Sequence, residues 1–139
     1  MIKVRFYDKI DDSLLKFAVI VSKYNNQWVF CKHRDRDTYE VPGGHREQSE
    51  CIDDTARREL YEETGAVDYE IKPVCIYSVS DSDNPYTNET FGMLYYAEIF
   101  KFDELPPFEI ERIEIFDTLP TEWTYPQIQP MLVEKIIEF

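Results

Sequence analysis

Helical spacing of apolar residues occurs in only two segments of this 139-residue chain, and strand-like segments fill most of the remainder. One helix is predicted for residues 51–64 in mid-chain, and the other for residues 130–139 at the C-terminus. A chain with many strands and few helices buries its apolar surface by packing a sheet against the helices. The expected fold class is therefore α/β, with a mixed β-sheet between helices.

The strands are predicted from alternating or β-rich segments. Residues 3–8 form a first short strand, and residues 15–35 form two strands joined by a turn at residues 24–27, where asparagines tolerate turn geometry. Residues 38–50 are predicted to be a loop, because Pro42 interrupts pairing and Gly43-Gly44 free the backbone. Further strands are expected at residues 69–80, 90–102 and 109–116, with a polar loop at residues 81–89.

The length and composition predict one globular domain over residues 1–139. Hydrophobic residues make up 43% of the chain and aromatic residues 15%, which excludes a disordered chain and supports a packed globule. No apolar run approaches the roughly 20 residues of a membrane helix, and the N-terminus lacks signal-peptide features. Cys31, Cys51 and Cys75 are odd in number and scattered, so a cytoplasmic location is expected.

The formal net charge of −13 limits the possible partners. Binding of extended DNA or RNA depends on lysine and arginine side chains that neutralise phosphates, so long nucleic acid is an unexpected partner. A small phosphorylated ligand remains compatible with the charge if metal cations lie between it and the protein. The oligomeric state is not determined by the sequence.

Three glutamates in the mid-chain helix share one side of it. Glu59, Glu62 and Glu63 stand at i, i+3 and i+4, and Glu59 and Glu63 fall within the same third of the helical wheel as the apolar Ile52, Ala56 and Leu60. A solvated helix places its acidic residues on the opposite side. The spacing thus predicts carboxylates at the edge of a buried seam.

The charges around these glutamates favour a cation. Asp53 and Asp54 each precede an arginine by four residues, which predicts ion pairs with Arg57 and Arg58. Glu59 and Glu63 have no such partner, and like charges at i, i+4 cost roughly 0.2–0.5 kcal/mol in an exposed helix. Converging carboxylate oxygens suit a hard divalent cation, Mg²⁺ or Mn²⁺.

Residues 44–66, GHREQSECIDDTARRELYEETGA, resemble the Nudix box, G-x5-E-x7-R-E-U-x-E-E-x-G-U, in which U is aliphatic. Every fixed letter is present, namely Gly44, Glu50, Arg58, Glu59, Glu62, Glu63 and Gly65. Leu60 fills the first aliphatic position and Ala66 the last. Ser49 stands where the family often has glycine, and Cys51 replaces a common helix-capping residue, so a weaker cap is expected.

The resemblance implies a Nudix-type α/β/α sandwich and a hydrolase that cleaves a nucleoside diphosphate linked to another group. It implies Glu59 and Glu63 as principal metal ligands, with Glu62 and a carbonyl of Gly43 or Gly44 in support. Arg58 orients the glutamates or pairs with Asp54, and Glu50 is either a supporting ligand or a helix-start acid.

The catalytic base is left open by the resemblance, because some relatives use a box glutamate and others use a later acid. Glu109 and Glu111 are the best candidates outside the box, since they follow a Pro-rich turn and open a strand; Glu98 is weaker. An exposed acid on an alternating strand is the alternative interpretation for each of them.

Substrate contacts are the least constrained part of the prediction. Lys32, Arg34 and Arg36 form a local basic patch that could hold outer phosphates. The alternative interpretation is that these three residues are solvated charges of a turn. Aromatic residues that could stack on a base, but more commonly serve packing, are Tyr39, Tyr86, Phe91, Trp123 and Tyr125. The residues expected to contact the substrate are Arg34, Arg36 and Tyr39.

The expected substrate is a nucleoside triphosphate such as 8-oxo-dGTP, because residues 39–44, YEVPGG, are similar to the MutT branch of the family. The alternatives are the 5′ end of RNA, sugar nucleotides or dinucleoside polyphosphates. A different class of function is a Nudix-like module that binds nucleotides without cleaving them; such modules usually lose box acids, and none is missing here.

Overall fold

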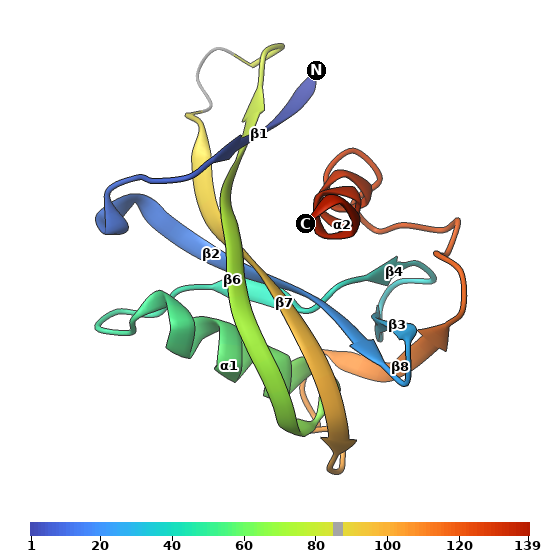
Figure 1. Ribbon diagram of the computed structural model, residues 1–139. Coiled ribbons are helices and arrows are strands. Elements are labelled where there is room, and N and C mark those ends of the chain that lie inside the picture. Colours follow the sequence, from blue (N-terminus) through green and yellow to red (C-terminus); the bar gives the residue numbers. More distant parts are fainter. Residues whose placement is uncertain (85–87) are drawn as a thin grey trace.

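A mixed β-sheet separates two helices in the computed structural model of the chain, which describes residues 1–84 and 88–139 (Figure 1). The strands are β1 (Ile2–Tyr7), β2 (Leu15–Tyr24), β3 (Gln27–His33), β4 (Tyr39–Glu40), β5 (Gly43–His45), β6 (Ala66–Asp81), β7 (Thr90–Phe102) and β8 (Ile110–Phe116). The helices are α1 (Ile52–Thr64) and α2 (Gln129–Glu138), with a short 3-10 helix η1 (Asp12–Leu14).

The sheet has the strand order β1-β6-β7-β2-β3-β4, with β5 paired to β2 and β8 paired to β3. β2 and β7 are parallel, whereas the other pairs are antiparallel. The turn between β2 and β3 has left-handed backbone at Asn25 (φ 49°) and Asn26 (φ 64°). Positive φ at both central residues is the geometry of a tight hairpin turn, as the two asparagines predict.

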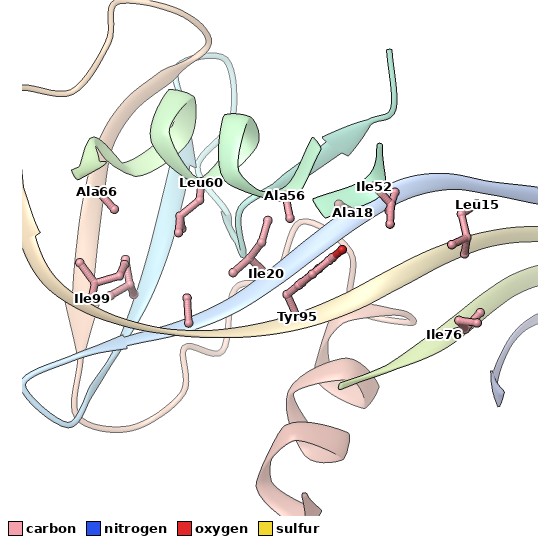
Figure 2. Close-up of a cluster of buried hydrophobic side chains, with 12 residues drawn as sticks. Leu15, Ala18, Ile20, Ile52, Ala56, Leu60, Ala66, Ile76, Tyr95 and Ile99 are labelled. Carbon is pink, nitrogen blue, oxygen red and sulfur yellow. The ribbon is translucent and has the colours of Figure 1, made fainter. Parts of the chain in front are cut away.

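Apolar side chains pack on both faces of the sheet. On one face, Ile52, Ala56 and Leu60 of α1 pack against sheet residues that include Ile20 and Tyr95 (Figure 2). On the other face, buried residues of α2 pack against the sheet; they are Leu132, Val133 and Ile136. The predicted α/β/α arrangement is therefore confirmed.

Helix α1 begins and ends where its sequence predicts. Cys51 is its N-cap and makes no side-chain capping hydrogen bond. Gly65 ends the helix in the left-handed conformation (φ 78°), and its N–H donates to the carbonyl of Tyr61 at 2.8 Å. A Cβ at residue 65 would lie 2.6 Å from the carbonyl oxygen of Asp103, so both the backbone angle and the space favour glycine.

Two parts of the strand prediction are wrong. Residues 38–50 are not entirely a loop, because they contain β4 and β5, and Gly43 and Gly44 pair with Val19 and Ala18 of β2. Strands of two or three residues are too short to show periodicity. β6 is also longer than predicted, since it continues through Pro73 with register shifts in its pairing with β7. Within residues 1–84 and 88–139, no helix combines the length and apolarity that a membrane crossing requires.

Candidate active site

A cavity of about 310 Å³ lies beside the C-terminal half of α1. It is lined by Glu59, Glu62, Glu63, Phe108, Glu109 and Ile110. The three box glutamates therefore share this cavity with an acid from the segment that leads into β8. The carboxylates are brought together by the i, i+3, i+4 spacing on one side of the helix, as the sequence predicts.

Glu59 is almost fully buried, with 9% of its surface exposed. Its carboxylate accepts a hydrogen bond from Nη1 of Arg58 at 2.8 Å. Burial raises the pKa of Glu59, and the adjacent Arg58 charge opposes the shift. A Cβ on Gly44 would lie only 2.4 Å from this carboxylate, so glycine at position 44 leaves the space that Glu59 occupies.

Glu63 lies against the neighbouring glycine. The N–H of Gly43 donates to Oε1 of Glu63 at 2.9 Å. The sequence predicted a carbonyl oxygen of this turn facing the acids, whereas the recorded contact is made by an N–H group. Burial raises the pKa of Glu63 to about 8, and the negative charges of Glu59, Glu40 and Glu109 act in the same direction. The protein alone therefore stabilises the ionised form of Glu63 poorly at this position.

Arg58 links the acids around the start and middle of α1. Its guanidinium donates to both carboxylate oxygens of Glu50 at 2.8 and 3.0 Å, and to the carbonyl of His45 at 2.9 Å. The same side chain also donates to Glu59 and, at 3.4 Å, to Glu62. These carboxylates raise the pKa of Arg58 above its already high ordinary value.

The ion pairs predicted from i, i+4 spacing are not formed among the described residues, whose salt bridges include neither Asp53 with Arg57 nor Asp54 with Arg58. Asp53 instead accepts a hydrogen bond from the hydroxyl of Tyr95, a buried residue of β7. Arg58 turns toward the box glutamates because several carboxylates surround it there. The orienting contacts expected from the resemblance are thus present.

Glu50 lies next to the cavity glutamates but is not part of the cavity lining. Its carboxylate accepts hydrogen bonds from Arg58, from the Thr55 hydroxyl at 2.6 Å and from the Glu47 N–H at 3.0 Å. These donors, Arg58 foremost, lower the pKa of Glu50 to about 2. In this arrangement Glu50 supports Arg58 and the start of α1.

The donor set of the cavity consists of carboxylate oxygens, which are the ligands that hard divalent cations prefer. The residues therefore fit such a cation chemically. The side chains do not yet stand as ligands: over residues 1–84 and 88–139, no three acidic, histidine or cysteine side chains are grouped to hold one ion. Glu59 and Glu63 are each occupied by a protein donor, Arg58 and Gly43 respectively.

The three candidate bases outside the box lie in different places. Glu109 lines the cavity, its side chain is 77% exposed, and it lies 3.8 Å from Nε2 of His33. Glu111 faces Lys32 at 3.4 Å and lies outside the lining. Glu98 accepts a hydrogen bond from Tyr96 at 2.8 Å on β7. Only Glu109 is thus brought together with the box glutamates.

Arg36 of the basic patch forms an ion pair with an acid of β4. Its Nη1 atom is 3.1 Å from Oε1 of Glu40, a residue with 8% exposure that pairs with Cys31 across β3 and β4. The Cys31 thiol contacts the carbonyl of Glu63 at 3.3 Å, so Glu40 and Glu63 share one face of the sheet. The Arg36 guanidinium also lies 5.9 Å from the ring centroid of Tyr125.

Glu40 was not predicted from the sequence. Its position between the apolar Tyr39 and Val41 could have indicated a strand with Glu40 on one face. Because a loop was expected here, the sequence did not predict where the Glu40 side chain points. Arg34 is exposed, and its backbone N–H donates to the carbonyl of Glu109 at 3.0 Å.

The other predicted substrate contacts are packing residues in the structure. Tyr39 lies on the α2 side of the sheet, where its ring is 5.1 Å from that of Phe116. Trp123 packs against Phe30, and Phe91 packs against Tyr7. These aromatic residues are not brought to the cavity. Tyr86 lies outside the described residues.

Comparisons with known proteins agree with this architecture. A family model of the NUDIX domain matches residues 14–127. The candidate 8-oxo-dGTP diphosphatase YtkD of Bacillus subtilis (strain 168) is 29% identical over 120 residues, which is 86% of this chain and 73% of YtkD.

Two solved structures are similar over most of the chain. A glutamate-to-alanine variant of the Bacillus subtilis pyrophosphohydrolase BsRppH superimposes with a TM-score of 0.79 at 25% identity, covering 99% of this chain and 90% of that one. The NUDIX domain of Shewanella oneidensis NrtR, solved with ADP ribose, has a TM-score of 0.68 at 17% identity, covering 89% and 86%.

The fold and the comparisons place this chain among the hydrolases of pyrophosphate bonds. The chain belongs to the Nudix family, whose model spans most of its length. Members of this family act on small nucleotide substrates and generally use divalent metals, and this chain is a Nudix pyrophosphohydrolase.

Proposed function

We propose that this enzyme hydrolyses a nucleoside triphosphate, with an oxidised purine nucleotide such as 8-oxo-dGTP as its preferred substrate, to the monophosphate and pyrophosphate. The observation that supports a compact nucleotide is the cavity of about 310 Å³, in which the box glutamates lie beside Glu109. The similarity to YtkD, named for 8-oxo-dGTP, supports the choice of substrate.

The proposed metal ligands are Glu59 and Glu63, assisted by Glu62, with Mg²⁺ or Mn²⁺ as the ion and Gly44 providing the space beside Glu59. A bound divalent cation supplies charge neutralisation for the phosphate oxygens and orients the reacting groups. Arg58 holds Glu59 and Glu62 in place, and Glu50 holds Arg58. Glu50 serves as a support in this proposal.

Glu109 is the proposed general base. Its exposed carboxylate lines the cavity and is free to take the proton of an attacking water. The water oxygen forms a new bond to phosphorus, the bond from that phosphorus to the bridging oxygen breaks, and the proton passes to Glu109. Glu62 is the alternative base, because it lines the same cavity.

Arg36 is the proposed contact for the distal part of the substrate. It is a cation that contacts Glu40 and lies over the ring of Tyr125. Arg34 is exposed beside the Glu109 segment and is the second candidate for a phosphate contact.

A second candidate substrate is the 5′-triphosphate end of RNA. It is favoured by the similarity to BsRppH over 99% of this chain. The net charge of −13 disfavours contacts along a transcript, so recognition of RNA would be confined to the terminal nucleotides.

Product analysis across a substrate panel tests the proposal. The panel contains 8-oxo-dGTP, dGTP, ADP-ribose, a dinucleoside polyphosphate and a 5′-triphosphate oligoribonucleotide, each assayed with and without Mg²⁺. The proposal predicts the highest kcat/KM for 8-oxo-dGTP and pyrophosphate as product. A higher kcat/KM for the oligoribonucleotide would establish the second candidate, and nucleotide binding without any turnover would contradict both.

A further inference from the structure

Arg46, in the loop between β5 and α1, makes an extensive set of hydrogen bonds although it is not a fixed letter of the Nudix box. Its Nε atom donates to the carbonyl of Glu50 at 2.7 Å. Nη1 donates to the carbonyls of Asp12 at 2.9 Å and Leu15 at 3.3 Å, and Nη2 is 2.9 Å from the Asp12 carboxylate. The backbone N–H of Arg46 donates to the carbonyl of Lys16 at 2.8 Å. The side chain thereby joins the loop before α1 to the segment that opens β2.

The loop fastened by Arg46 has a strained backbone. The backbone of Ser49 is in the left-handed region (φ 67°), which residues other than glycine and asparagine rarely adopt. Ser49 lies between Arg46 and the Glu50 carbonyl that Arg46 binds. A hollow of about 540 Å³ beside the loop, lined in part by Lys16, Gln48 and Ser49, gives the loop room to move if it is released.

The far end of this loop is connected to the acidic cavity. Glu50, whose carbonyl Arg46 holds, binds Arg58 through both carboxylate oxygens. Arg58 in turn donates to Glu59 at 2.8 Å. A continuous series of contacts therefore runs from Asp12 through Arg46, Glu50 and Arg58 to Glu59.

We propose that Arg46 is a positioning residue that fixes the Glu50 backbone and thereby holds Arg58 and Glu59 in the orientation needed to bind the divalent cation. This inference rests on the proposed use of Glu59 as a metal ligand. Lysine cannot replace the planar guanidinium, whose separate N–H groups reach a carboxylate and three carbonyls at once.

The test measures Mn²⁺ binding to the full chain without substrate, by electron paramagnetic resonance, together with Mg²⁺ dependence of turnover. For R46M, the Mn²⁺ dissociation constant is expected to rise about tenfold. This is the low end of the loss in metal affinity that follows when a residue supporting a metal ligand is replaced. At saturating metal, kcat is expected to recover to within about twofold of the original enzyme, because Arg46 touches neither ligand nor cavity. R46K is expected to show an intermediate shift.

Two further variants separate positioning from stability. R57M removes an arginine of α1 that lies over Tyr69, away from the cavity, and is expected to leave Mn²⁺ binding unchanged. R46M/S49G relieves the backbone strain at residue 49 and is expected to regain thermal stability without regaining Mn²⁺ affinity. Recovery of both thermal stability and Mn²⁺ affinity in the double variant would show that Arg46 has a purely structural role and would overturn the inference.

The inference and the proposed function fail in distinguishable ways. If the original enzyme neither binds Mn²⁺ nor depends on Mg²⁺, the proposed metal function is wrong. If the original enzyme binds Mn²⁺ and R46M and R46K bind it equally well, the inference alone is wrong. Should R46M fail to fold, R46K and the double variant give the same comparison.

Discussion

Glu59 and Glu63 lie on the same side of α1, yet each is placed by a different glycine of β5. Glu59 occupies the space that a side chain at Gly44 would fill, whereas Glu63 accepts the N–H of Gly43. The two glycines thus set how closely the helix and strand approach. The Nudix box contains both a glycine and glutamates that lie about 15 to 19 residues further along the chain. The folded structure brings Gly44 into contact with Glu59.

Gly44→Ala tests this contact. The added methyl group would lie 2.4 Å from the Glu59 carboxylate, so Glu59 must move. We expect a loss of activity of about tenfold or more and a higher Mg²⁺ concentration at half-maximal activity, since displaced metal ligands lose affinity. Circular dichroism is expected to show an intact fold. Unchanged Mg²⁺ dependence would show that the position of Glu59 does not matter for the metal.

Glu109→Gln and Glu111→Gln, compared as a pair, test the assignment of the base. Glu109 lines the cavity and Glu111 faces Lys32 away from it, although the two are only two residues apart. Loss of a general base lowers kcat by about 10²–10⁴-fold, and we expect this for the Glu109 variant alone. If only the Glu111 variant loses activity, the assignment must be exchanged; if neither does, a box glutamate is the base.

At the scale of elements, a carboxylate joins β1 and β6 to the start of β7. Glu89 accepts hydrogen bonds from the Tyr7 hydroxyl at 2.7 Å and from the Ser78 hydroxyl, and Arg5 lies 3.8 Å away. The Ser78 hydrogen bond, followed by that of Tyr7, lowers the pKa of Glu89. A lowered pKa means that the ionised form stabilises the fold above the unfolded pKa, and that this contribution is lost as the pH falls through the folded pKa.

Glu89→Gln is therefore expected to lower the free energy of unfolding by about 1 kcal/mol at pH 7 and by less in acid, at a pH below the folded pKa, where Glu89 of the original protein is protonated. Urea unfolding at both pH values measures the difference. Glu138→Gln, an exposed position at the end of α2, is the control and is expected to have little effect. An equal loss at both pH values for Glu89→Gln would show that its charge is not involved.

The elements differ in how much of them the sequence predicts. The β2–β3 hairpin, α1 and β8 follow from local signals: two adjacent asparagines, a glycine cap at residue 65 and an alternating pattern. β4 and β5 carry no local signal, because they are strands only through their pairing with β3 and β2.

The same distinction applies to the site. The box glutamates follow from helical spacing, whereas Glu40 and Arg46 depend on contacts between segments distant in sequence. The i, i+4 pairs of Asp53 and Asp54 were predicted wrongly because tertiary partners, Tyr95 for Asp53 and the box acids for Arg58, replace the local ones. Tertiary contacts outweigh a helix-surface pair that contributes only about 0.5 kcal/mol.

At the scale of the whole molecule, a net charge of −13 surrounds a cavity that is itself acidic. A substrate must therefore approach with its charge reduced, which is consistent with a metal complex of a small nucleotide. A long polyanion would meet repulsion along its length. The overall charge thus favours recognition of a terminal phosphate group over recognition of a chain.

Activity on 5′-triphosphate RNA is accordingly expected not to increase with RNA length. Extending the oligonucleotide to about 20 nucleotides should leave kcat/KM unchanged or lower it, and added salt should not reduce it, because the net charge of −13 disfavours contacts along the phosphate backbone. Kinetics over a length series at two salt concentrations measures the effect of RNA length and the effect of salt on kcat/KM. A gain with length that is lost in high salt would reveal a nucleic-acid surface that the net charge conceals.

The binding of a divalent cation by the inward carboxylates of α1 is tested most directly by Glu63→Gln, with Asp54→Asn on the same helix as the control. Glutamine can still accept the Gly43 N–H, so the fold should persist, while Mn²⁺ binding and Mg²⁺-dependent pyrophosphate release should fall by at least about a hundredfold. Asp54 is exposed and its variant should keep both. Full Mn²⁺ binding and turnover in Glu63→Gln would contradict the account.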